Sequence, residues 1–257
     1  MDLELKGRAV LVTGGSKGIG LACARAFLDE GAKVAIVSRD GANLDKAAAQ
    51  MPQVRTIVAD LTRAEDAARM AQEAERALGP IDVLVNSAGA AKRYPPDELN
   101  AQAWHAAMDA KYFTYIHAMD AVLPSMRSRQ RGVVVNIIGT GGKVATPIHL
   151  PGGAANSALM LASVGLAGVY GKFGVRINAI NPGATMTGRI REALALEAIA
   201  KGVAVDKVLE DGQSRVPLGR YADPEDIARV ALFLASGLAA YVTGAIIPMD
   251  GGLNPII

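Results

Sequence analysis

The sequence predicts an α/β protein, a single doubly wound Rossmann-type domain spanning residues 1–257 around a mostly parallel, seven-stranded sheet. Short apolar runs alternate with segments of helical periodicity along the whole chain. The runs are apolar at consecutive positions, which is typical of strands covered on both faces of a parallel sheet. The length of 257 residues suits one large domain, and a 51% hydrophobic content supplies a sizeable core.

Seven strands are expected, each a short apolar run bounded by polar or turn-forming residues. The first reads AVLVT and runs directly into glycines. The expected strands are Ala9–Thr13, Lys33–Ser38, Val54–Ala59, Val83–Asn86, Gly132–Ile138, Val175–Ile180 and Ala245–Met249.

Helices are expected between these strands, because right-handed crossovers connect parallel neighbours. Residues 185–219 are rich in Ala, Glu and Lys and follow a strand end, so we expect a helical segment covering a site, with a plain surface insertion as the alternative. The other expected helices are Gly18–Glu30, Asn43–Met51, Arg63–Leu78, Gln102–Ser128, Ala154–Tyr170 and Pro224–Leu234.

Composition excludes several classes of protein. The net charge is only +2 and no Lys/Arg run is present, which argues against a nucleic-acid binder. The lone Cys23 cannot form a disulfide within the chain and reads as a small buried side chain. No grouping of residues suggests a metal site.

The N-terminal residues do not indicate secretion. The first 15 residues carry acids and no apolar run of signal length. The charge-free stretch 144–171 is long enough to cross a bilayer, but Pro147, Pro151, Gly152 and Gly153 should leave only a shorter helix after them. We therefore expect no membrane span and a cytoplasmic location.

A glycine-rich loop, TGGSKGIG at residues 13–20, follows the first expected strand and opens the first expected helix. Phosphate binding needs outward N–H groups at a helix N-terminus, and glycines where Cβ atoms would collide. Gly14 would turn the chain out of the strand, Gly18 would admit a pyrophosphate, and Gly20 would let the helix pack on the sheet. The loop's position predicts dinucleotide contacts from Gly14, Ser16, Lys17, Gly18, Ile19 and Gly20.

The glycine spacing resembles the TGxxxGxG of the short-chain dehydrogenase/reductase family. Residues 86–89, NSAG, are similar to that family's NNAG, and residues 178–183, NAINPG, to its NAxxPG. VTG at 242–244 and DGG at 250–252 resemble its C-terminal motifs. The resemblance covers nearly the whole chain in order, and it implies a Rossmann-type fold and a nicotinamide dinucleotide.

The end of the second expected strand favours NADP over NAD. A site for NAD usually places a carboxylate there for the ribose 2′-hydroxyl, whereas this chain has Ser38 followed by Arg39. A guanidinium can hold a 2′-phosphate with paired donors, and Lys17 adds a second cation. Solvated surface charge is the alternative for both cations. Asp40 lies one residue later, so NAD stays possible.

The resemblance implies further cofactor contacts. Asp60 and Leu61 would flank the adenine, and Asn86, Ala88 and Gly89 would line the adenosine side. A cap for a helix near Thr62 is the alternative or additional role of Asp60. Near the nicotinamide, the resemblance implies Pro182, Gly183, Thr185 and Thr187.

The family's Asn–Ser–Tyr–Lys catalytic set has no counterpart at the matching positions. Alignment on NSALM and the downstream GVRIN places Asn156 where the lysine belongs and Gly152 where the tyrosine belongs. Gly139 then stands at the serine position, and Lys111, in DAK, at the asparagine position. No Tyr-x-x-x-Lys occurs anywhere in the chain. The usual proton transfer therefore does not carry over.

Three side chains are candidates for a different proton path. Lys111 could hold the ribose or donate a proton, because partial burial would lower its pKa. Tyr115 lies four residues on, on the same helix face, as a partner or as core packing. His149 lies in the loop over the site and titrates in the right range. Asn156, at the catalytic lysine position, is the third candidate catalytic residue, whereas Lys143 reads as surface charge.

The helix expected over residues 154–170 carries no charge on any face, so it should be covered on all sides. The resemblance implies a homodimer or homotetramer formed through the helices at 104–128 and 154–170. Loops of the same chain covering these helices are the alternative.

Three functional hypotheses follow. The first is an NADP(H)-dependent oxidoreductase acting on a small carbonyl, alcohol or activated alkene with a non-standard proton relay. The second is a non-catalytic nucleotide-binding or scaffold protein. A third is a non-redox enzyme, such as a lyase, that keeps the nucleotide as a structural element.

Overall fold

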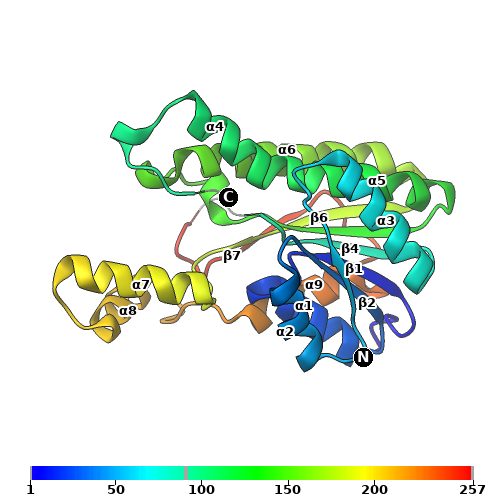
Figure 1. Cartoon of the computed structure of the whole chain (residues 1–257), viewed down its shortest axis with the longest axis horizontal. Helices are drawn as coiled ribbons and strands as arrows, with labels where there is room; N and C mark the ends of the chain where they lie inside the picture. The colour runs from blue at the N-terminus through cyan, green and yellow to red at the C-terminus, as the bar shows by residue number, and fades with distance from the viewer. Residues whose placement is uncertain (1, 90–91, 256–257) are drawn as a thin grey trace.

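A computed structural model describes residues 2–89 and 92–255 of the chain. Its seven strands form one sheet in the order β3-β2-β1-β4-β5-β6-β7, with helices on both faces (Figure 1). The predicted α/β doubly wound fold is confirmed. The sheet, expected to be mostly parallel, is parallel at every pairing within the described residues.

The strands lie close to their predicted bounds. The pairing of Asn181 with Pro248, and of Pro182 with Met249, carries β6 two residues beyond its predicted end, through an Asn-Pro pair that reads as a turn. The strands are β1 (Ala9–Thr13), β2 (Lys33–Ser38), β3 (Arg55–Val58), β4 (Val83–Asn86), β5 (Gly132–Ile137), β6 (Val175–Pro182) and β7 (Ile246–Met249).

Most helices also begin and end within a few residues of the prediction. They are α1 (Gly18–Asp29), α2 (Gly41–Gln50), α3 (Ala64–Leu78), α4 (Ala101–Ala107), α5 (Thr114–Ser128), α6 (Leu150–Tyr170), α7 (Gly188–Lys201), α8 (Val205–Gln213) and α9 (Pro224–Ala235). Short turns of 3₁₀ helix are η1 (Pro96–Glu98), η3 (Thr140–Gly142), η4 (Pro147–His149), η5 (Gly171–Phe173) and η6 (Gly237–Ala239).

Two apolar cores cover the two faces of the sheet. In β1, Leu11 packs with α3, α5 and α6, while Val10 and Val12 pack with α1, α2 and α9. Figure 1 shows the first group of helices above the sheet and the second below it. The consecutive apolar residues of each strand supply both cores, as expected for a buried parallel sheet. Cys23 is buried in the second core, and burial raises the pKa of its thiol to about 12.

The prediction of one continuous helix over Gln102–Ser128 is wrong in one respect, because the observed helix is divided into α4 and α5. The segment between α4 and α5, Met108–Phe113 (η2), is π-helical. Its residues are ordinary helix formers, so no sequence signal marks the wider turn. π-helical turns occur frequently at functional sites, and this one contains Lys111.

The prediction that Pro151, Gly152 and Gly153 interrupt the apolar stretch is also wrong. Helix α6 begins at Leu150, and Pro151 lies in its first turn, where a missing N–H costs nothing. The resulting helical stretch Pro147–Phe173 has 27 residues and is apolar and long enough to cross a membrane, although 44% of its most apolar window is buried inside this chain. On its outer side, Leu161, Val164 and Val169 are exposed.

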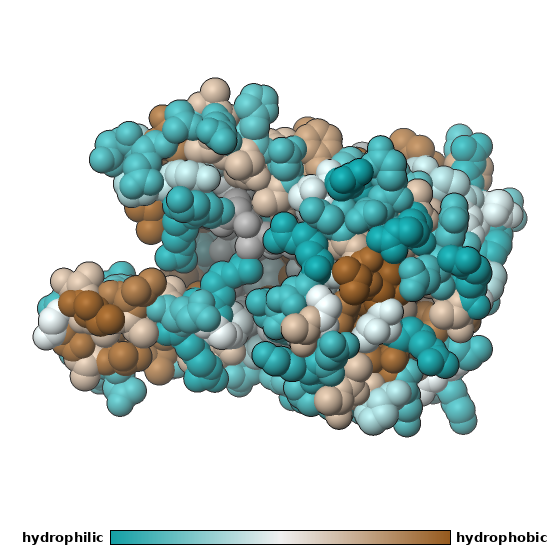
Figure 2. Space-filling view, viewed as in Figure 1, coloured by the Kyte–Doolittle hydropathy of each residue, from teal (hydrophilic) through white to brown (hydrophobic). Residues whose placement is uncertain are grey.

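Residues 185–219 contain the two helices α7 and α8, which confirms a helical segment after β6. The two helices pack on each other through a small cluster of Leu194, Ala198 and Val208 that is separate from both cores. They project from the body of the protein beside an open face (Figure 1). Figure 2 shows apolar side chains on this projection, where Leu196, Ile199, Val203 and Val205 are exposed.

A row of buried polar side chains crosses the carboxyl ends of the central strands. Thr13 donates to Asn86 (3.3 Å), Asn86 to Asn136 (2.9 Å), and Asn136 to Ser163 of α6 (2.9 Å). Each group is buried and has a partner, so the row links β1, β4, β5 and α6 without the penalty of an unpaired polar atom.

Replacing Asn136 by Ala should lower the free energy of unfolding by about 1–3 kcal/mol, because the Asn86 amide would then be buried without its acceptor. Urea denaturation measures this change. Gln53→Ala, which removes an exposed amide from a turn, is the control. A loss for Asn136→Ala no larger than the control's would contradict the structural role of the row.

Candidate functional site

The candidate site lies where the strand order reverses, between β1 and β4. Ligands of open α/β sheets bind in the crevice outside the strand ends at such a point. The turn after β1 and the turn after β4 touch there, since a Cβ at Gly14 would lie 2.7 Å from the Ser87 carbonyl oxygen. Gly14 also has a φ of +65°, which favours glycine. Thr13 Oγ1 accepts from the Ser87 and Ala88 amides at 3.1 and 3.2 Å and fixes this contact.

The glycine loop lies against both its own strand and a distant segment. A Cβ at Gly20 would collide with the Gly14 carbonyl, so only glycine lets α1 start this close to the strand. A Cβ at Gly18 would lie 3.3 Å from Cγ2 of Thr187, the residue before α7. Helix α1 has no acid in its first turn and no side-chain cap, which leaves its N-terminal N–H groups for an anion. This is the cradle predicted for a pyrophosphate.

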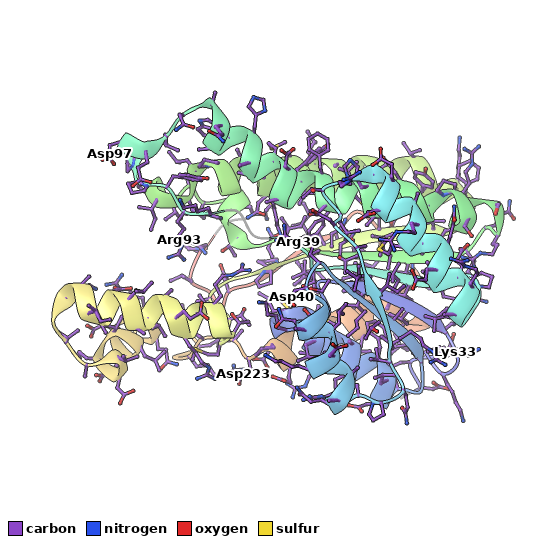
Figure 3. All side chains as sticks on the ribbon, in the orientation of Figure 1. Lys33, Arg39, Asp40, Arg93, Asp97 and Asp223 are labelled. Carbon is purple, nitrogen blue, oxygen red and sulfur yellow. The ribbon has the colours of Figure 1, made fainter. Side chains whose placement is uncertain are left out.

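At the end of β2, the acid Asp40 is bound to a helix, whereas its neighbour Arg39 is not paired with a carboxylate among the described residues. Asp40 caps α2 by accepting from the Asn43 amide at 3.1 Å. The Ser38 hydroxyl accepts from the Asp40 amide at 3.3 Å. Arg39, between them, forms no ion pair among the described residues (Figure 3). The carboxylate thus belongs to the helix, and the guanidinium remains available at the strand end.

The residues assigned to the adenosine side serve the fold in part. Asp60 accepts from the amide and hydroxyl of Thr62 at 3.1 and 2.9 Å. Because α3 begins only at Ala64, Asp60 is not its cap, which corrects that alternative. Leu61 is buried in a core cluster. Asn86 is fully buried, and its amide oxygen and nitrogen are each bonded within the buried row, so its side chain does not face a ligand.

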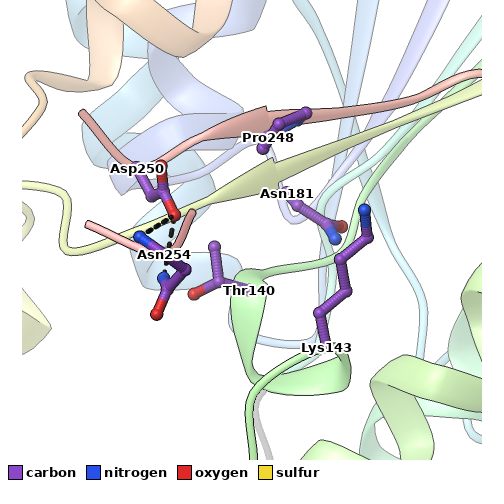
Figure 4. Close-up of a pocket in the computed structure, with 6 residues that line it drawn as sticks. All are labelled: Thr140, Lys143, Asn181, Pro248, Asp250 and Asn254. Atoms are coloured by element: carbon purple, nitrogen blue, oxygen red, sulfur yellow. Dashed lines mark hydrogen bonds between the residues drawn. The ribbon is translucent and has the colours of Figure 1, made fainter. Parts of the chain in front are cut away.

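The turns after β4 and β6 are also tightly built. Gly89 has a φ of +101° and contacts the Ala110 carbonyl of η2 so closely that a Cβ would collide. A Cβ at Gly183 would lie 2.9 Å from Asp250 Cα, beside Pro182. Thr185 is buried. A small pocket opens next to them (Figure 4), lined by Thr140, Lys143, Asn181, Pro248, Asp250 and Asn254.

Lys111 and Tyr115 meet at the end of β5. The Lys111 ammonium donates to the Tyr115 hydroxyl at 2.9 Å and to the Ile137 carbonyl at 3.2 Å, and the Tyr115 hydroxyl also donates to that carbonyl. Both side chains are buried. Burial, with a smaller contribution from the positive charge of Arg189, lowers the pKa of Lys111 to about 7. Burial raises the pKa of the Tyr115 hydroxyl far above its usual range, so it stays protonated.

Glycines bring the loop after β5 against the start of α6. A Cβ at Gly142 would lie 2.8 Å from the backbone of Asn156, and a Cβ at Gly153 2.7 Å from the Gly141 carbonyl oxygen. The Ser157 hydroxyl donates to the Gly142 carbonyl at 2.5 Å. The loop after β5 and the start of α6, which contain the positions of the family's serine, tyrosine and lysine, therefore pack backbone against backbone.

His149 and Asn156 lie on either side of this loop. A Cβ at Gly141 would be 3.5 Å from His149 Cδ2 and 3.6 Å from Asn156 Nδ2. Burial first, then the charges of Arg93, Lys111 and Arg189, lower the pKa of His149 below its ordinary value. The imidazole is therefore mainly neutral at neutral pH, the form that can accept a proton or a hydrogen bond.

The residues present fit a dinucleotide along this edge. Within residues 2–89 and 92–255, three buried side-chain atoms around the β5 and β6 ends have no hydrogen-bond partner: His149 Nδ1, Asn156 Oδ1 and Asn181 Oδ1. Buried polar groups are normally paired. The two amide oxygens are acceptors suited to sugar hydroxyls or a carboxamide, and the glycine cradle is suited to phosphates.

Sequence reasoning missed Arg93, Arg189 and Asn181. No motif singles out an exposed arginine, and the proximity of Arg93 and Arg189 to His149 follows only from the fold. Asn181 falls inside the motif NAINPG, but nothing in the motif shows that its oxygen is buried without a partner.

Comparisons with known proteins agree along the whole chain. A family model described as Enoyl-(Acyl carrier protein) reductase matches residues 14–254. The 2-(S)-hydroxypropyl-CoM dehydrogenase 3 of Xanthobacter autotrophicus is 34% identical, with 100% of each chain covered. L-sorbose reductase from Gluconobacter frateurii, solved with NADPH and L-sorbose, superposes with a TM-score of 0.95 at 26% identity, covering 100% of both chains.

One further solved structure is similar. It is an NADPH-bound short chain oxidoreductase from Pseudomonas aeruginosa PAO1 described as containing an atypical catalytic center. It is 32% identical, with a TM-score of 0.89, and the match covers 98% of this chain and 99% of that one.

The buried Lys111 should make stability depend on pH. Its pKa is about 7 in the folded protein and 10.5 when unfolded, so between these values the unfolded chain binds more protons. Stability should therefore rise with pH across this window, by at most about 1.4 kcal/mol per pH unit. Lys111→Met removes this pH dependence. The free energy of unfolding of the variant should therefore exceed that of the wild type most at pH 7, and the difference should shrink toward pH 10.

Urea unfolding of both proteins at several pH values provides the measurement. Lys33→Met, which removes an exposed ammonium from the start of β2, controls for the loss of one charge. A constant difference between wild type and Lys111→Met from pH 7 to pH 10 would contradict a depressed pKa.

Proposed function

The chain belongs to the short-chain dehydrogenase/reductase family, and we propose that it is an NADP(H)-dependent oxidoreductase acting on a small carbonyl, alcohol or activated alkene. Its proton path differs from that of the family, because the Tyr–Lys pair is absent from the sequence. One observation carries the proposal: the phosphate cradle of β1 and α1 is complete, while a buried, hydrogen-bonded ammonium lies at the end of β5.

NADP(H) is the cofactor of this proposal. Several similar structures are NADPH complexes by their descriptions. Arg39, at the end of β2, has no ion-pair partner among the described residues, and Asp40 is held as the cap of α2. A guanidinium there favours a 2′-phosphate, whereas a free carboxylate would repel it. The bound nicotinamide would supply or accept the hydride.

The other predicted contacts divide between the two ends of the cofactor. Ser16, Lys17, Ile19 and the loop glycines would hold the phosphates. The backbones of Asp60, Ala88 and Gly89 would face the adenosine, with Leu61 and Asn86 supporting them from within. Pro182, Gly183, Thr185 and Thr187 would face the nicotinamide, where the acceptor oxygens of Asn156 and Asn181 have no partner among the described residues.

Lys111 would serve as the proton donor for reduction. An ammonium has three hydrogens, and Lys111 uses two of them on Tyr115 and Ile137. The third remains for a substrate oxygen, a ribose hydroxyl or a bridging water. A pKa of about 7 suits a group that must give and regain a proton near neutral pH. Tyr115 would act as a positioning residue, because it is fully buried and accepts from the ammonium.

Helices α7 and α8 would cover the substrate, and α6 would form a subunit contact. Leu161, Val164 and Val169 expose one apolar side of α6, and Trp104 and Phe113 are exposed on the neighbouring α4 and η2. A second copy packed on this face would complete the burial of a helix that is apolar all round. A homodimer or homotetramer through residues 104–128 and 154–170 fits these exposures.

A broad assay separates this function from a non-catalytic scaffold. NADPH oxidation over a panel of aldehydes, ketones and enones should show turnover of at least one compound. Tight NADPH binding without turnover of any of them would favour the scaffold instead. Product formation with no change in nicotinamide absorbance would indicate a non-redox reaction.

Arg39→Gln should weaken NADPH binding about 10- to 100-fold and leave NADH binding nearly unchanged, because hydrogen bonds to a charged group contribute about 1.5–3 kcal/mol. Fluorescence titration with both coenzymes gives the dissociation constants. Arg25→Gln, on the exposed side of α1 where Arg25 donates to Gln50, is the matched control. Equal losses for NADPH and NADH would place the guanidinium away from the 2′ position.

Lys111→Met should lower kcat about 10²- to 10⁴-fold while the Kd for NADPH stays within a few-fold of the wild type. The wild-type reduction rate should fall as pH rises above 7, since the ammonium then loses its proton. The residual rate of the variant should lack this pH dependence. Tyr115→Phe should shift the midpoint of the profile without abolishing it.

Kinetic pH profiles on any substrate found by the panel test these expectations. Lys33→Met is again the control for charge and should retain the wild-type profile. A Lys111→Met enzyme with full kcat and an unchanged profile would exclude Lys111 from the proton path.

A further inference from the structure

Three cations lie close enough to His149 for their charges to act on its imidazole. Arg93, Lys111 and Arg189 all act on the imidazole, and Arg189 also acts on Lys111. The charges that shift the pKa values of His149 and Lys111 are all positive. A protein with a net charge of only +2 has therefore gathered positive charge in one place.

The fold brings these cations together from different elements. The Tyr94 amide donates to the Ile148 carbonyl at 3.0 Å, which fixes Arg93 beside the turn that contains His149. Arg189 lies in the first turn of α7, two residues after Thr187. Figure 3 shows Arg93 extending from the segment before α4 into the space above α7. Figure 2 shows the molecule hollowed there, with hydrophilic side chains on the upper rim and at the base of the α7–α8 projection.

Two aspartates of this protein hold five of its other arginines. Asp82 holds Arg8, Arg129 and Arg131, and Asp226 holds Arg220 and Arg229. In the part of the chain that the structure describes, neither Arg93 nor Arg189 lies within 4.0 Å of a carboxylate oxygen. Two guanidiniums without a carboxylate partner, both near His149, suit a site for a planar or tetrahedral anion.

We propose that the substrate carries an anionic group, a carboxylate, sulfonate or phosphate, that Arg93 and Arg189 hold across the hollow while its reacting carbon lies toward Lys111. This inference rests on the proposed oxidoreductase function and names its substrate class. Arg93 and Arg189 select the anion, and the neutral His149 can donate or accept a hydrogen bond beside it.

The competing role for Arg189 is to hold the cofactor. Gly18 of the phosphate cradle contacts Thr187, so the first turn of α7 lies near the expected pyrophosphate. In that case the arginine would raise NADPH affinity and would not distinguish one substrate from another. Affinity for NADPH therefore has to be measured in every variant.

Matched pairs of substrates test the proposal. The pairs are levulinate and methyl levulinate, phenylglyoxylate and its methyl ester, and dihydroxyacetone phosphate and dihydroxyacetone. Each pair keeps the carbonyl and changes the charge. For the wild type, kcat/KM should favour the anion at least about 10-fold in one pair or more, since a hydrogen bond to a charged group contributes about 1.5–3 kcal/mol.

Arg93→Gln and Arg189→Gln should each lower the ratio of kcat/KM for that anion to kcat/KM for its neutral partner about 10-fold or more. Arg191→Gln is the matched control, because Arg191 is exposed on the same turn of α7 and is not among the charges acting on His149. Its kinetics should equal those of the wild type.

A measurement without turnover separates this proposal from the proposed function. Calorimetric titration of the enzyme–NADP⁺ complex with the three anions should show binding of at least one, lost in both Arg variants. Anion binding with no NADPH oxidation would support the anion-binding site and contradict the proposed oxidoreductase function. Turnover of neutral carbonyls with no anion preference and no effect of the variants would overturn the anion site and leave the oxidoreductase standing. A raised Kd for NADPH in the Arg variants, with an unchanged anion-to-neutral ratio, would assign these cations to the cofactor and also overturn it.

Discussion

The close approach of two backbone turns, after β1 and after β4, is the constraint on which the rest of the site depends. Gly14 meets the Ser87 carbonyl there, and Thr13 Oγ1 accepts from the two amides that follow β4. From Thr13 the buried polar row continues to β5 and α6. The phosphate cradle and α6 are therefore linked through one row of buried hydrogen bonds, and a cofactor seated on the first would have a defined position relative to the second.

The second governing feature is the buried ammonium of Lys111. Charge in an apolar interior is expensive unless it is paired, and this ammonium has only neutral partners, a hydroxyl and a carbonyl. The protein therefore favours the uncharged amine more than water does, which is the physical content of the lowered pKa. The π-helical turn η2 contains this residue, and the same turn contacts Gly89 through Ala110. A buried side chain with a strongly shifted pKa, held beside turns expected to bind the cofactor, is typical of a functional residue.

The sequence allowed the sheet, the cradle and most helices to be predicted, because consecutive apolar residues and a glycine loop after a strand each have one common structural solution. It did not reveal the π-helical turn, since Met108–Phe113 are compatible with an ordinary helix. Pro151 was misread as a helix break because its place in the first turn depends on where the chain enters the helix. Arg93 and Arg189 escaped notice because they lie almost 100 positions apart in the sequence, and only the topology brings both to His149.

The surplus of positive charge links the two halves of the proposed chemistry. Burial, and to a smaller extent repulsion from Arg189, disfavours the charged form of Lys111, so at neutral pH a substantial fraction of the amine lacks the proton that reduction would require. An anionic group between Arg93 and Arg189 would offset that repulsion and raise the pKa of Lys111. Binding of the substrate would then itself load the proton donor. A neutral compound of the same shape would leave Lys111 partly deprotonated, so in such an arrangement discrimination would arise in kcat as well as in KM.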